Sequence, residues 1–236
     1  LLSKKRAMLM SLSVIVFGVG LFIMTQAQTS GFERFFIRTI LGTDGAMRIE
    51  DRIQATMATM QIEGQSGVST TVEMDNHRRY IEGVRHPHAI KESLFSFKGV
   101  SGVSEILTGS VELDTNFRKT LIRLYGINID EHLQVSMLEN QIKRGSVRAF
   151  RRNQKGLMVG SVIARRNNLR VGDYVIIRNG DIVQRFKVEA IFESGVDHVD
   201  RKRIFAHMSE ARAILNEPFG VTYLQVAFTD PDRAIE

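Results

Sequence analysis

The sequence contains no cysteine and no tryptophan among its 236 residues. The lack of cysteine excludes a disulfide scaffold, a cysteine-based zinc site, an iron–sulfur protein and a thiol enzyme. Prolines are also scarce, with three against 19 glycines, so the composition is not that of a disordered or fibrous chain. The mean hydropathy of −0.08 is too low for a bundle of several membrane spans. Most of the chain is therefore expected to be water-soluble.

Motifs of catalysis are missing as well. The sequence holds no G-x-x-x-x-G-K-[ST] segment, so it cannot bind ATP phosphates in a P-loop. His86 and His88 flank a proline without a third ligand at close spacing, which favours a solvated loop over a metal site. His198 lies between Asp197 and Asp200, but no nucleophile accompanies them, so a polar loop is favoured over an acid–base pair. We therefore expect no enzymatic activity, no metal and no cofactor.

One long apolar run contrasts with the polar average. Residues 7–24 carry no charge, and as a helix they would extend about 27 Å, close to the thickness of a bilayer hydrocarbon core. Lys4, Lys5 and Arg6 directly precede the run, and by the positive-inside rule they predict a cytoplasmic N-terminus. We assign residues 1–6 to a cytoplasmic basic flank and residues 7–27 to a transmembrane helix in contact with membrane lipids.

A cleavable signal peptide is the alternative explanation, with residues 25–27 as a poor cleavage site. The apolar run is longer than the roughly 7–15 residues usual for a signal peptide. Downstream, Phe32, Phe36 and Ile40 recur at helical spacing, which predicts an amphipathic stalk helix over residues 28–43. We therefore favour a retained span. With either alternative, the rest of the chain lies outside the cytoplasm.

The remainder of the sequence alternates short strands with a few helices in no strict βαβ order, which predicts an α+β fold. The predicted strands cover residues 46–53, 103–113, 119–125, 156–160, 174–178, 183–192, 203–205 and 221–228. The predicted helices cover residues 89–98, 133–144, 161–168 and 209–215. Between two of the strands, Asn179 and Gly180 are typical of a two-residue type I′ hairpin turn.

Basic side chains are grouped in the second half of the chain, where they could suggest nucleic-acid binding. The predicted topology places them outside the cytoplasm, so we expect no nucleic acid and assign them to a solvated face, to a surface near anionic lipids or to an acidic partner. They are Lys143, Arg144, Arg148, Arg151, Arg152, Lys155, Arg165, Arg166 and Arg170. The chain starts with Leu1, and Asp230-Pro231 is typical of a helix start, so we expect a fragment of a longer polypeptide.

The order of the segments resembles the first half of the FtsX-like ABC transporter permeases, the superfamily that includes the lipoprotein-releasing (Lol) permeases and MacB. The resemblance runs over nearly the whole chain. It rests on the basic flank and apolar run, and on residues 30–33 (SGFE), 40–42 (ILG), 89–111, 125–130 (YGINID), 156–173 and 186–195 followed by Asp200. It implies a two-lobed, MacB-like periplasmic core. Residues 44–124 with 199–236 would form a porter-like α+β lobe, and residues 125–198 an inserted β-rich lobe.

The resemblance also implies a function. The chain would belong to a permease subunit in the bacterial inner membrane, with three further spans beyond the periplasmic domain. Its partners would be a separate P-loop ATPase and a second permease subunit, in a homo- or heterodimer, with mechanotransmission to the periplasm in place of passage through a pore. A lipoprotein released from the membrane is the expected cargo. Candidate cargo-facing or stalk residues are Phe17, Phe22, Met24, Phe32 and Phe36. For any single one of them, ordinary lipid or helix packing is the favoured explanation, because a span must be apolar in any case.

One departure from the family concerns the periplasmic chaperone as a partner. The lipoprotein-releasing permease that recruits this chaperone uses a long hook between two strands, whereas Asn179 and Gly180 leave room only for a tight turn. Docking of a chaperone in that manner is therefore not expected. The alternative function is a single-pass, membrane-anchored extracytoplasmic interaction module, such as an adaptor or a divisome-type regulator, that transports nothing.

Overall fold

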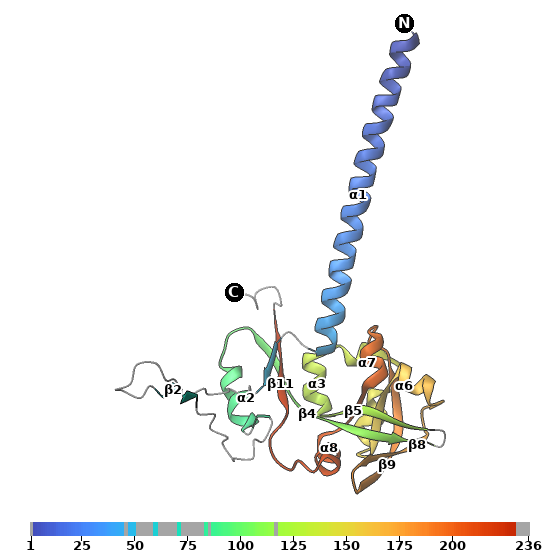
Figure 1. Cartoon of the computed structure of the whole chain (residues 1–236). Helices are drawn as coiled ribbons and strands as arrows, with labels where there is room; N and C mark the ends of the chain where they lie inside the picture. The colour runs from blue at the N-terminus through green and yellow to red at the C-terminus, as the bar shows by residue number, and fades with distance from the viewer. Residues whose placement is uncertain are drawn as a thin grey trace.

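A single long helix rises from one end of an α+β domain in the computed structural model of the protein (Figure 1). The structure describes residues 2–44, 47–50, 59–60, 70–71, 83–84, 86–115 and 118–229. Its helices are α1 (Leu2–Asp44), α2 (Pro87–Phe95), α3 (Ile129–Val135), α4 (Leu138–Gln141), α5 (Val147–Arg152), α6 (Ser161–Arg166), α7 (Asp197–Lys202) and α8 (Met208–Leu215). The 43 residues of α1 are continuous and cover both the apolar run and the expected stalk.

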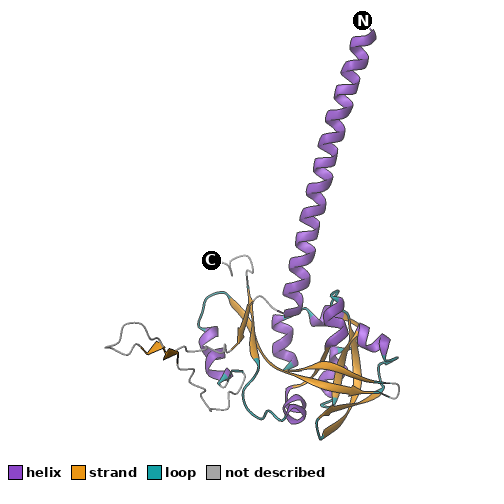
Figure 2. Cartoon of the chain, in the orientation of Figure 1, coloured by secondary structure: helices purple, strands orange, loops and turns teal. Residues whose placement is uncertain are grey.

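Nine of the strands form one sheet, and β2 and β3 pair separately (Figure 2). The strands are β1 (Met47–Glu50), β2 (Thr59–Met60), β3 (Thr70–Thr71), β4 (Val100–Asp114), β5 (Lys119–Ile127), β6 (Ile142–Gly145), β7 (Gly156–Gly160), β8 (Tyr174–Asn179), β9 (Ile182–Phe192), β10 (Arg203–His207) and β11 (Tyr223–Phe228). The hydrogen-bonded order is β1-β11-β4-β5-β10-β7-β9-β6, and β8 pairs with both β9 and β4. The α+β class predicted from the sequence is confirmed.

Six of these strands close into a barrel. Starting from β4, the pairs run β4–β5, β5–β10, β10–β7, β7–β9, β9–β8 and back through β8–β4. The barrel interior is apolar, and its fully buried side chains include Leu113, Leu124, Leu157, Phe186 and Ile204. Closure leaves these strands without free edges along most of their length, which removes sites for unwanted strand pairing.

The open part of the sheet extends from the first half of β4. β11 pairs with β4 over Val100–Ile106, and β1 pairs with β11. Successive residues of β4 face opposite sides of the sheet, so Val103 packs with α2 residues, whereas Ile106, three positions later, packs with α3 residues. A partly buried ion pair joins the two helices, with Lys91 Nζ 2.5 Å from Glu131 Oε1. This part is therefore a sheet between two helical layers.

The predicted helix over residues 133–144 is correct only in part, because residues 133–135 belong to α3, residues 138–141 form α4, and the rest is not helical. Helix α3 begins earlier, after Asn128 caps it by accepting the amide of Asp130, and it ends at Val135, since the backbone of Ser136 is extended. The chain then forms α4 and the strand β6, which pairs with β9. Tertiary pairing outweighs the helical periodicity here, since β6 completes an edge of the sheet. Helices α5 and α7 were not predicted, and the loop expected around His198 is helical.

The two predicted lobes share the sheet. Strands β7 and β8, which lie within residues 125–198, pair with β10 and β4, which lie outside that range. The division into two lobes stays a prediction. Its boundary would separate strands that are paired with each other in the sheet. Residues 51–53 of the first predicted strand and residues 230–236 of the porter-like lobe lie outside the described residues.

Helix α8 closes one side of the barrel by direct contact with glycines. A Cβ placed on Gly126 would lie 2.3 Å from Ala211 Cβ, and one on Gly109 would lie 2.4 Å from Leu215 Cδ2. The missing side chains on β4 and β5 thus allow the helix to pack against the strands.

We predict that Gly126→Ala lowers the free energy of unfolding by about 1–3 kcal/mol, because the added methyl group displaces α8. Ser101→Ala, at an exposed position on β4, should change it by less than about 0.5 kcal/mol. The measurement is urea unfolding of the full chain, followed by the near-ultraviolet circular dichroism of its four tyrosines, which all lie outside α1. Equal stability of the two variants would contradict the packing argument.

Candidate functional site

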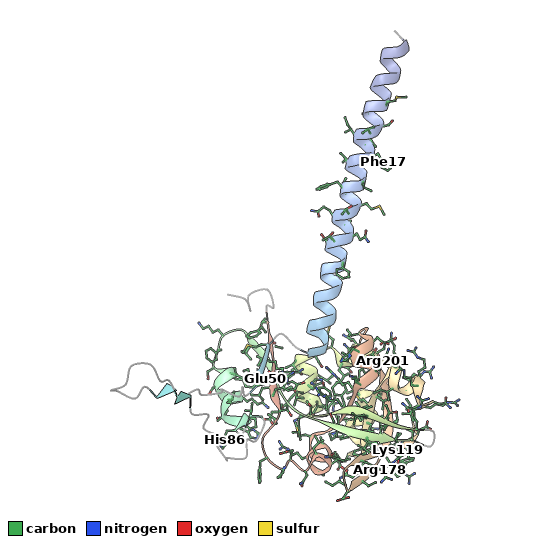
Figure 3. The ribbon with its side chains drawn as sticks, viewed as in Figure 1. Phe17, Glu50, His86, Lys119, Arg178 and Arg201 are labelled. Carbon is green, nitrogen blue, oxygen red and sulfur yellow. The ribbon has the colours of Figure 1, made fainter. Side chains whose placement is uncertain are left out.

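The apolar part of α1 is exposed along its whole length. The 21 residues Leu12–Phe32 are long and apolar enough to cross a membrane, and none of this window is buried against the domain. The window overlaps the predicted span, residues 7–27. Four of the five candidate residues lie in it, with exposed fractions between 67% and 75%: Phe17, Phe22, Met24 and Phe32. Figure 3 labels Phe17, which lies far from the domain.

Two threonine side chains within the window are satisfied by the helix itself. Thr25 Oγ1 donates to the carbonyl oxygen of Leu21 at 2.9 Å, and Thr29 Oγ1 donates to that of Thr25 at 2.9 Å. Hydroxyl groups bonded in this way can lie in hydrocarbon at low cost, because they need no water. These two threonines therefore fit a membrane environment, as does the apolar composition of the window.

Four other predicted residues belong to α1 by their backbone alone. Lys4, Lys5 and Arg6 occupy the start of the helix, and Phe36 lies beyond the apolar window. Their side chains lie outside the part of the chain that the structure describes. The topological role of the three basic residues and the stalk role of Phe36 stay predictions.

Helix α1 is joined to the sheet by a very short connection. It ends at Asp44, and β1 begins at Met47. In β1, Ile49 pairs with Leu224 of β11, and the Arg48 guanidinium lies 3.8 Å from the centre of the Tyr223 ring. The first described residues after the helix, those of β1, are thus held by backbone pairing and by a cation–π contact. Movement of the helix end would act directly on this edge of the sheet.

The β8–β9 connection is as tight as predicted, but the turn was placed one residue too early. Asn179 pairs with Ile182, so the loop residues are Gly180 and Asp181. Gly180 has φ +57°, whereas Asp181 has no positive φ. This pattern is that of a type II′ turn and corrects the predicted type I′ turn. The Asn179 side chain donates to the carbonyl oxygen of Ile214 at 2.9 Å, which ties the turn to α8.

The histidine and carboxylate clusters have structural roles. Asp197 pairs with Arg201, and buried Asp200 accepts the Ser194 amide at 2.9 Å and the Ser161 hydroxyl at 3.5 Å. Within the described residues, no hydrogen bond or ion pair joins either carboxylate to the histidine between them. His88 Nδ1 lies 3.7 Å from Glu105 Oε1. The described residues include no group of three or more side chains that could hold a metal ion.

Sequence analysis missed a buried polar cluster on the outer face of the barrel. His132 of α3 lies against Phe205 of β10, with ring centres 5.3 Å apart. Arg203 lies over the Tyr125 ring at 4.4 Å and is itself buried. Burial, and then the charge of Arg203, lower the pKa of His132 from 6.5 to about 3. No sequence signal identifies this cluster, since it depends on the pairing of β5 with β10.

We predict that His132 makes the domain less stable in acid. The unfolded chain binds a proton at this residue near pH 6.5, whereas the folded chain keeps it neutral down to about pH 3. The stabilisation is therefore complete above pH 6.5 and is lost as the pH falls towards 3, by roughly 2 kcal/mol at pH 5. Urea unfolding at pH 7 and pH 5 should show a smaller loss for His132→Phe than for the unsubstituted chain. An identical loss in both would refute the assignment.

A family model and one solved structure agree with this architecture. A family model described as the MacB-like periplasmic core domain matches residues 8–236. The periplasmic region of MacB from Actinobacillus actinomycetemcomitans has a similar structure, with a TM-score of 0.51 and 14% sequence identity over 82% of this chain and 78% of that chain. The extracellular domain of the noncanonic ABC-type transporter YknZ from Gram-positive bacteria aligns with a TM-score of 0.48 and 16% identity, over 63% and 75% of the two chains.

A curated relative is similar in sequence over part of the chain. The lipoprotein-releasing system transmembrane protein LolC of Xylella fastidiosa is 26% identical over 119 residues, which cover 46% of this chain. The alignment covers 29% of that relative, well under half of its length.

Proposed function

The chain belongs to the family of MacB-like periplasmic core domains, and we propose that it forms the first membrane span and the periplasmic domain of the permease subunit of an ABC transporter. The observation that carries this proposal is the unbroken helix α1, which leads from an exposed apolar window into the edge of the sheet. Such a helix can transmit movement between the membrane and the domain, because an α-helix is stiff over a few tens of ångströms.

Retention of the span is supported by two features. The family match starts at residue 8, so the apolar window is part of the family pattern and does not precede it. After Phe32 the helix continues to Asp44, which adds about 18 Å beyond the apolar window. A cleaved signal peptide would leave neither feature with a role.

The driving energy would come from ATP hydrolysis in the cytoplasm. We propose a separate cytoplasmic ATPase and a second permease subunit, identical or different, as partners, in line with membership of the MacB-like family. Nucleotide-driven movement of the spans would tilt or shift α1. The displacement would pass through β1 and β11 to β4, and from there to the barrel. We place the whole assembly in the bacterial inner membrane, with the domain in the periplasm.

We propose a lipoprotein, released from the inner membrane, as the cargo. The support is the partial similarity to a protein named for lipoprotein release. Cargo-facing positions would come from the exposed apolar residues Phe17, Phe22, Met24 and Phe32. Phe36, further along α1, is the fifth proposed position. The tight turn at Gly180 argues against a hook for a periplasmic chaperone at this hairpin.

The proposed orientation predicts an asymmetric labelling pattern. The chain has no native cysteine, so a single introduced cysteine reports its own position. In spheroplasts, a membrane-impermeant maleimide should label Ser96→Cys, at the exposed end of α2, and should label Ser3→Cys only after permeabilisation. The reverse pattern would overturn the orientation. Loss of the residue-3 label together with a smaller mature chain would indicate a cleaved signal peptide.

The stalk is predicted to couple ATP hydrolysis to release. In the complete permease reconstituted with its ATPase, Phe32→Glu and Phe36→Glu should reduce lipoprotein release about tenfold while ATP hydrolysis continues, because a charge disrupts apolar contacts of the stalk. Phe219→Glu puts the same charge on an exposed loop of the domain and should leave release unchanged. Unimpaired release by the two stalk variants would remove the stalk from the mechanism.

The second candidate is a membrane-anchored interaction module that transports nothing. It is favoured by the single helix, among the described residues, that could cross a membrane. The gene sequence beyond the codon for Glu236 separates the two functions. Three further apolar segments of about 20 residues each, and a neighbouring frame with a P-loop, would support the permease. A soluble continuation would support the module.

A further inference from the structure

A small pocket on the outer face of the barrel is lined by cationic side chains from three elements. It has a volume of about 390 Å³ and lies between β5, β10 and α7. Its basic residues are Arg123, His198, Lys202 and Arg203, and the hydroxyl-bearing residues Ser110 and Tyr125 complete its polar lining. No acidic side chain among the described residues lines it.

The fold brings these charges together through strand register and helix spacing. In the parallel pair of β5 and β10, Arg203 lies directly beside Arg123. Leu124, between Arg123 and Tyr125, points into the barrel, so its two neighbours point outward. His198 and Lys202 are four residues apart on α7, which places them on one face of the helix. Like charges placed side by side in a sheet are destabilising unless something neutralises them.

Two carboxylates on neighbouring elements form ion pairs with residues outside the pocket. Asp197 pairs with Arg201, and Glu112 lies 3.2 Å from Lys119. Within the described part of the chain, Arg123, His198 and Lys202 form no ion pair.

Arg203 forms the buried part of the pocket lining. Its side chain is buried, with 8% of the residue exposed, and its guanidinium lies over the Tyr125 ring. Its guanidinium charge also acts, after burial, to lower the pKa of His132. A rigid, buried guanidinium with exposed cations at the rim is a common arrangement for binding oxyanions.

We propose that this pocket binds a phosphate group, carried by a free phosphate compound or by a phospholipid headgroup. Phosphate fits because its several acceptor oxygens and its charge match two guanidinium groups and an ammonium group in one small volume. The apolar rim residue Leu121, which is 74% exposed, could contact a lipid chain. Figure 3 labels Arg201, on α7, at the end of the domain from which α1 rises, and Lys119 and Arg178 at the opposite end.

The test is titration calorimetry on the full chain, purified in a maltoside detergent without phosphate buffer. Inorganic phosphate is one ligand, and a water-soluble short-chain phosphatidylglycerol is the other. Arg123→Gln and Lys202→Gln should each weaken binding about tenfold, because each removes a charge-assisted hydrogen bond. Arg201→Gln is the matched control, since it removes the same charge from α7 outside the pocket and should leave affinity within about twofold.

The outcomes separate the two sources of phosphate. Tighter binding of the lipid, weakened by Leu121→Ser without effect on inorganic phosphate, would assign the pocket to a headgroup. Equal affinities, with no effect of Leu121→Ser, would assign it to a free phosphate compound. Absence of binding by the unsubstituted chain up to about 10 mM of either ligand would overturn the proposal. Equal weakening by Arg201→Gln would also overturn it, because general surface charge would then suffice. None of these measurements depends on the ATPase or on transport.

Discussion

The backbone pairing of β4 is the constraint on which the rest of the domain depends. Its first half pairs with β11, and its second half pairs with β5 and β8, so one strand belongs both to the open sheet and to the closed barrel. Helix α8 lies on this strand where Gly109 permits close contact. Because β1 and β11 connect α1 to the same strand, β4 is also where any displacement of the helix would enter the barrel.

The two sides of the barrel wall serve different physical purposes. The interior is filled by interlocking apolar side chains, which fix the shape of the barrel. The outer wall near α3 and α7 instead contains a buried histidine and a buried arginine held among aromatic rings. Burying such groups costs stability, so their presence favours a binding role for this wall over a purely structural one.

Much of the fold could be predicted because its strands follow clear local patterns. The alternation in β4, β8 and β9 and the apolar run in α1 are visible in the sequence, and the order of the segments identified the family correctly. The short helices α5 and α7 and the strand β6 could not be predicted, since they depend on tertiary contacts and not on periodicity. The pocket at Arg203 was equally inaccessible, because the parallel pairing with β5 brings together residues far apart in the chain.

The late position of β11 in the chain has a consequence for biosynthesis. The anchored helix and β1 are made first, yet their only paired neighbour among the described strands is the last one, Tyr223–Phe228. Until that segment emerges, β1 and the first half of β4 present unpaired backbone, a state prone to aggregation. A nascent chain interrupted before this point would contain α1 and β1 without the strand that pairs with β1. The pairing that joins α1 to the sheet can therefore form only after β11 has been made.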